Sequence, residues 1–136
     1  ALIDNTLFVV LGLATLSPDG TEGRGMAVAW FVIAAVYEIG LTASRGQTLG
    51  KLAVATQVVD RSQERLPAWN QAVVRWLVPA LPNIAGLIVM HVAFDVIGVV
   101  WLVFVYLPIL RSPDRRGWHD RAAGTIVIDR ALVRVD

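Results

Sequence analysis

The stretch GMAVAWFVIAAVYEIGLTA, residues 25–43, decides the fold class of this chain. A helix that crosses a membrane needs about 20 mostly apolar residues, and this stretch supplies a full span with Glu38 as its single charged residue. The whole composition agrees: 56% of residues are hydrophobic, 17% are charged, and the mean hydropathy is +0.61. Soluble domains usually carry about 25% charged residues. We therefore predict one integral membrane domain.

Three further spans are predicted on either side of this stretch. The apolar start of the chain is a shortened span rather than a signal peptide, because it lacks a charged leading region and contains Asp4. One helix over residues 73–110 would be about 57 Å long, nearly twice the roughly 30 Å of the hydrocarbon core. We therefore divide it at residues 90–95. The predicted fold is an all-α membrane protein with four transmembrane helices, at about 1–16, 25–43, 72–90 and 95–110.

The basic residues predict the orientation of these spans. Cytoplasmic loops of membrane proteins carry an excess of Lys and Arg. Residues 44–75, which include the start of the third span, and the C-terminal tail hold eleven of the twelve basic residues, and Arg24 alone lies in the first connection. We therefore predict that residues 44–71 and 111–136 are cytoplasmic, with both chain termini on that side.

The segment RGQTLGK, residues 45–51, invites comparison with a phosphate-binding loop. That loop needs four residues between its glycines and a Ser or Thr after the lysine. Here three residues separate Gly46 from Gly50, and Leu52 follows Lys51. The net charge of +1 also argues against a nucleic-acid partner, and the absence of cysteine excludes disulfides and cysteine metal sites. We expect no nucleotide, no nucleic acid and no cofactor.

The same segment is better explained as part of a small cytoplasmic joint. Gly46 can end the second span, and Gly50 allows a further turn or a close backbone approach. Residues 53–60 and 124–130 both have the β-branched composition of short strands, and neither is long enough to stand alone. We predict that they pair as a two-stranded element beneath the bilayer. Arg75, at the start of the third span, suits the membrane interface.

Three segments of the chain resemble the RDD family of small bacterial membrane proteins: GQTLGKLAVATQVVD (46–60), AVVRW (72–76) and RRGWHDRAAGTIVI (115–128). The resemblance covers nearly the whole chain and implies a location in the bacterial cytoplasmic (inner) membrane. Asp4 and Asp120 match the two aspartates of the family name. The arginine expected before the first helix has no counterpart, because the chain starts at Ala1, and we expect part of the N-terminus to be missing. The residues that match the family motifs are Gly46, Thr48, Gly50, Lys51, His119, Asp120, Gly124 and Thr125.

Acidic residues in or near the apolar spans are the first candidates for function. A carboxylate inside a membrane is costly, so each needs a partner, water or a proton. Asp4 is expected to pair with the missing arginine, and Glu38 with the surroundings of Asp4 or with a basic loop residue. Asp95 follows His91 by one helical turn. The two form either a proton-sensitive pair or, as we favour, the polar cap of an external turn.

The dipeptide His119-Asp120 is the remaining candidate. A metal site needs three or four ligands, and no further His, Asp or Glu lies at a suitable spacing. Asp120 is instead expected to cap a short helix, residues 121–124, that Gly124 ends. No serine is arranged with a histidine and an acid for nucleophilic work. We expect neither a metal nor an enzyme.

Two functions follow from these features. The favoured hypothesis is a non-catalytic accessory subunit that docks on a larger membrane (transport) complex, since small residues along the spans allow close helix contact. The alternative is a cation–proton exchanger that uses Asp4, Glu38 and Asp95. The resemblance implies it weakly, since sodium–proton exchange has been associated with some RDD proteins. Carriers of this kind generally show internal repeats, and none is visible in the sequence.

Overall fold

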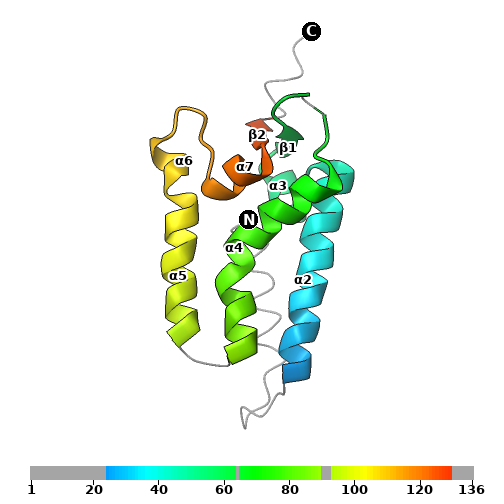
Figure 1. Cartoon of the computed structure of the whole chain (residues 1–136). Coiled ribbons are helices and arrows are strands. Elements are labelled where there is room, and N and C mark those ends of the chain that lie inside the picture. Colours follow the sequence, from blue (N-terminus) through cyan, green and yellow to red (C-terminus); the bar gives the residue numbers. More distant parts are fainter. Residues whose placement is uncertain (1–23, 64, 90–92, 130–136) are drawn as a thin grey trace.

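Three long helices lie side by side in the computed structural model, which describes residues 24–63, 65–89 and 93–129 (Figure 1). Helix α4 contacts both α2 and α5 and so lies between them. The short elements gather at one end of this bundle, and the described chain is mostly helical. The elements are α2 (Arg24–Arg45), α3 (Leu49–Ala53), β1 (Thr56–Asp60), α4 (Trp69–Val89), α5 (Ala93–Tyr106), α6 (Pro108–Arg111), α7 (Trp118–Ala123) and β2 (Thr125–Asp129).

One described helix, α2, is long and apolar enough to cross a membrane, over Val28–Arg45. Helix α4 is also long, but Asn70, Gln71 and Arg75 lie in its first two turns and lower its apolarity. Residues Ile97–Arg111 form a shorter apolar helical stretch. The predicted first span, residues 1–16, lies outside the described residues. The described residues therefore include one helix with the length and apolarity of a membrane span, and the number of four spans stays a prediction.

The ends and bends of the long helices follow from local residues. Helix α2 ends at Arg45 because Gly46 adopts a left-handed backbone conformation, with φ +66°, which a residue with a side chain adopts only with strain. A side chain there would also place its Cβ atom 2.5 Å from the carbonyl oxygen of Val58. Helix α4 contains Pro79 and Pro82 and changes direction along its course (Figure 1), since each proline removes a backbone donor.

The predicted two-stranded element is confirmed. Strands β1 and β2 pair antiparallel, with Val58 opposite Val127 at the centre of the register. Val58 and Val59 are buried, and because consecutive strand residues point to opposite faces, β1 is covered on both faces at its centre. The prediction that the first strand starts at residue 53 was wrong, because residues 49–53 form helix α3. The Leu49 N–H donates a hydrogen bond of 3.0 Å to the Tyr37 hydroxyl of α2, which holds the start of this short helix.

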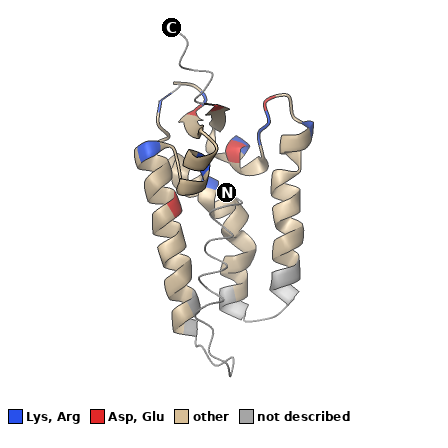
Figure 2. Ribbon diagram, turned by 180° about the vertical axis from the view of Figure 1, so that it is seen from behind, with Lys and Arg blue, Asp and Glu red and all other residues tan. Residues whose placement is uncertain are grey.

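Charged and apolar residues are separated along the bundle. Most charged positions lie at the end that carries α3, α7 and the sheet (Figure 2). The long helices instead expose apolar side chains, as expected of helices in a membrane. On α2 and α5 the exposed ones are Met26, Val28, Val32, Ile33, Val36, Ile97, Val99, Val100, Val103 and Phe104.

Candidate functional site: a buried ion pair at the end of the bundle

Asp120 occupies the third position of α7, whose N-cap residue is Gly117. Its Oδ2 atom accepts a hydrogen bond of 3.3 Å from the Gly117 N–H, so the carboxylate satisfies one of the N–H groups that every helix leaves unpaired at its start. We expected Asp120 to precede its helix as the cap. The helix begins earlier, at Trp118, and Asp120 lies inside the first turn. Gly124 ends the helix with φ +67°, as expected.

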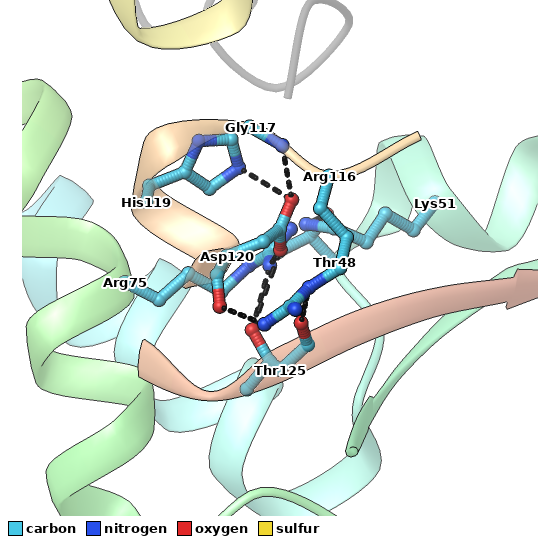
Figure 3. A network of polar contacts seen from close by, with 8 residues as sticks. All are labelled: Thr48, Lys51, Arg75, Arg116, Gly117, His119, Asp120 and Thr125. Carbon is cyan, nitrogen blue, oxygen red and sulfur yellow. Dashed lines mark hydrogen bonds and ion pairs between the residues drawn. The ribbon is translucent and has the colours of Figure 1, made fainter. Parts of the chain in front are cut away.

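The carboxylate of Asp120 is surrounded by donors from three elements (Figure 3). Its Oδ1 atom forms an ion pair with Arg75 Nη1 of α4 and accepts a hydrogen bond of 3.3 Å from the Thr125 hydroxyl of β2. Its Oδ2 atom lies 3.2 Å from His119 Nε2. Asp120 is only 1% exposed. We call Arg75, Asp120 and Thr125 the clamp, because they join α4, α7 and β2.

Arg75 is the clamp residue whose partner was not predicted from the sequence. Its expected place at the membrane interface stays a prediction, and its side chain is 10% exposed and held by Asp120. Its Nη1 atom also donates a hydrogen bond of 3.0 Å to the Thr125 hydroxyl. A signal was available: a charged residue at the start of an apolar run must find a partner. The sequence gives no indication that this partner lies 45 residues later in the chain.

A second arginine, Arg116, supports the clamp through the backbone. Its Nε atom donates a hydrogen bond of 2.9 Å to the Thr125 carbonyl oxygen, and its Nη2 atom donates one of 3.1 Å to the Asp120 carbonyl oxygen. Burial, followed by the nearby positive charge of Arg61, lowers the pKa of Arg116 from its usual value. Arg116 therefore ties the last turn of α7 to the start of β2.

His119 is neutral in this environment. Burial is the main reason that its pKa is lowered to about 3, and the positive charges of Arg75 and Lys51 lower it further. The distance to Asp120 alone would suit a charged pair, but the burial and the two nearby cations outweigh that attraction. Nε2 therefore carries the proton and donates a hydrogen bond to Asp120 Oδ2. The Nδ1 atom is buried and has no hydrogen-bond partner among the described residues, and the ring packs against Tyr106 at 4.7 Å between centroids.

The first family motif folds next to the second one. Thr48 and Lys51 are buried, and Lys51 Nζ donates a hydrogen bond of 3.3 Å to the Thr48 hydroxyl. Gly50 is buried inside α3 and does not form a separate turn; the close backbone approach, the other role expected for it, stays a prediction. Lys51 and His119 line the same small cavity. The structure thus brings together motif residues from both halves of the chain.

Glu38, the acidic residue of α2, also lines this cavity. Its volume is about 20 Å³, enough for roughly one water molecule. Glu38 thereby shares a cavity with two basic residues, one of which, Lys51, lies in the predicted loop. The residues that line it are Glu38, Thr42, Lys51, Ala72, Arg75, Trp76, Pro79, Tyr106 and His119.

The other predicted site residues fall at the borders of the described structure. Asp4 and His91 lie outside the described residues. Asp95 lies within α5, but its side chain is not described. Its pairing with His91, its role as a turn cap and the role of Asp4 all stay predictions. Over residues 24–63, 65–89 and 93–129, no group of three or more His, Cys, Asp or Glu side chains could hold a metal ion.

The family model that matches this chain is that of the RDD family, over residues 2–124. The chain belongs to the RDD family. The matched range contains the motif segment 46–60, residues 115–124 of the last motif segment, and the clamp residues Arg75 and Asp120; Thr125 follows it directly. No curated protein and no solved structure matches the chain. RDD membership and the apolar helix α2 together support a membrane protein.

Proposed function

We propose that this RDD protein is a non-catalytic accessory subunit of a larger complex in the bacterial cytoplasmic membrane. The observation that supports this most strongly is the closure of the clamp. Both oxygens of Asp120 are bonded by donors of the protein itself, and the side chain is buried. A general acid or base must come within hydrogen-bond reach of its substrate. The ion pair and hydrogen bonds of Asp120 instead hold α4, α7 and β2 together.

The exposed face of α2 supports a protein partner within the membrane. Gly25 and Ala29 are both exposed and lie four residues apart, with Val32 and Val36 continuing the same face. Two small residues at this spacing let the backbones of neighbouring membrane helices approach closely. A buried ion pair that joins the elements at one end and an exposed helix face with small residues suit a subunit that docks on another chain.

We place the charged end of the bundle in the cytoplasm. Exposed basic residues lie where α2 ends and around the sheet: Arg45 is the last residue of α2, Arg61 directly follows β1, and Arg65 lies in the connection to α4. The positive-inside rule then sets the orientation. The chain has no cysteine, so a single introduced one reports topology cleanly. In intact cells the Ser62→Cys variant should resist a membrane-impermeant maleimide and react after permeabilisation. Labelling in intact cells would mean that the charged end faces the outside of the cell, opposite to the orientation proposed.

The subunit role is tested by gentle purification from the source membrane, with the mass of the intact assembly measured. We expect a second protein in fixed stoichiometry. The Ala29→Leu variant should lose this protein, because leucine fills the close approach on α2, while Val99→Leu on α5 should retain it as a matched control. A chain that purifies alone, without losing stability, would reject the proposal.

Cation–proton exchange is the second candidate, and the position of Glu38 favours it. Glu38 lines a cavity next to Lys51 and Tyr106, where a carboxylate could bind and release a proton. In reconstituted vesicles an exchanger should move protons against a sodium gradient, and Glu38→Gln should abolish this while helicity is unchanged. Exchange at wild-type rate in that variant would remove Glu38 from the mechanism, and no exchange in the wild type would reject the candidate.

A further inference from the structure

We propose that the corner formed by α5, α6 and α7 binds an anionic phospholipid of the surrounding membrane. The first observation is an exposed aromatic stack. Phe104 of α5 and Trp118 of α7 have ring centroids 6.0 Å apart with 13° between their planes, and they are 52% and 44% exposed. Ile97 and Val100, at helical spacing before Phe104, continue the exposed apolar strip along α5. A lipid acyl chain matches such a strip.

A positive charge lies at the end of this strip. The Arg121 guanidinium lies 5.5 Å from the centre of the Trp118 ring, and its Nη2 atom donates a hydrogen bond of 3.2 Å to the Ser112 hydroxyl. The order from Phe104 through Trp118 to Arg121 therefore runs from apolar to amphipathic to charged. A phospholipid has the same order of acyl chain, interfacial region and phosphate, and tryptophan prefers that interface.

The local charge selects an anionic lipid over a zwitterionic one. Arg111, Arg115 and Arg121 are all exposed in or beside this corner. The acid in the same segment, Asp114, lies 3.6 Å from Arg61, so its charge is already shared with a different arginine. The corner therefore carries an excess of positive charge next to an apolar strip. A basic group near a membrane surface favours anionic lipid by about fivefold, the factor that corresponds to roughly 1 kcal/mol.

The test uses the tryptophan of the site as its reporter. The full chain is reconstituted in phosphatidylcholine vesicles that contain an equal small fraction of brominated phosphatidylglycerol or of brominated phosphatidylcholine. The difference in quenching between wild type and Trp118→Phe isolates Trp118, and phenylalanine keeps the stack with Phe104. We expect brominated phosphatidylglycerol to quench this component several-fold more efficiently.

Arginine variants then assign the preference to this corner. Arg121→Gln should reduce the phosphatidylglycerol preference about fivefold, Arg121→Lys should keep most of it, and Arg65→Gln, an exposed arginine before α4, should leave it unchanged. Equal quenching by the two lipids in the wild type would overturn the proposal, even if a variant failed to fold. Absence of quenching by both would also overturn it and would show that protein covers Trp118. A preference that persists in Arg121→Gln would place the lipid elsewhere.

Discussion

Replacing Asp120 by asparagine should strongly destabilise this protein. Each carboxylate oxygen of Asp120 faces donors: Arg75 and Thr125 at Oδ1, and His119 and Gly117 at Oδ2. The asparagine side chain has one acceptor group, its carbonyl oxygen, and one donor group, its NH2. In either orientation of the amide, the NH2 group therefore faces donors of the protein. It also removes the negative charge that compensates the buried guanidinium of Arg75.

The size of this effect can be estimated in two ways. Two opposite charges about 4 Å apart attract by roughly 4 kcal/mol at an effective dielectric constant near 20. Removing one partner of a buried ion pair typically costs about 3–5 kcal/mol. We therefore expect Asp120→Asn and Arg75→Met each to lower the free energy of unfolding by about 3–5 kcal/mol. The double variant should lose less than the sum, because the two residues interact with each other.

The assay is equilibrium unfolding of the purified chain in mixed detergent micelles, followed by the loss of helical circular dichroism. Arg61→Gln is the matched control, since it breaks the exposed pair with Asp114 at 3.6 Å and should cost at most about 1 kcal/mol. Our reasoning is refuted if Asp120→Asn and Arg75→Met are as mild as this control, or if the double variant loses the full sum of the two.

Three further predictions concern the glycines and the histidine around the clamp. Gly117→Ala should lower the free energy of unfolding by about 1–3 kcal/mol, because the new Cβ atom would lie 2.6 Å from His119 Cε1 and 2.9 Å from the Val105 carbonyl oxygen. Stability like that of the wild type in the same micelle assay would argue against this packing. Gly46→Ala should cost at least as much, since φ is +66° and the Cβ atom would meet the Val58 carbonyl oxygen at 2.5 Å, and a melting temperature unchanged from the wild type would contradict this. His119, with a pKa of about 3 in the folded protein against 6.5 ordinarily, should remain neutral by NMR at pH 5. Between these two values the unfolded state binds the extra proton, so stability should fall by up to about 1.4 kcal/mol per pH unit as the pH drops; an unchanged slope in His119→Phe would show that other groups cause it.

Local sequence signals predicted the elements that local interactions determine. The left-handed glycines end α2 and α7 where expected, and the β-branched segments pair because each is too short to exist alone. Helix α3 could not be predicted in this way. It has one helical turn, and its start depends on the hydroxyl of Tyr37, which α2 brings near only after folding.

The clamp depends even more on tertiary structure. Asp120 and His119 were selected from a motif, but their partner Arg75 lies on a different helix. No periodicity in the chain relates a residue of α4 to one of α7, and only the packing of these helices brings them together. The same holds for the cavity that Glu38, Lys51 and His119 share. The sequence could indicate that each charged group needs a partner, and the fold decides which partner it has.

The central claim, that this RDD protein docks on another membrane protein through α2, is tested most directly by site-specific photo-crosslinking in living cells. A photoreactive amino acid would replace Ala29 on the exposed face of α2, and in a control strain it would replace Val99 on α5. We predict one discrete adduct with a single different protein from position 29 and lipid adducts from position 99. Lipid adducts alone at both positions, or crosslinks only to further copies of this chain, would contradict the account.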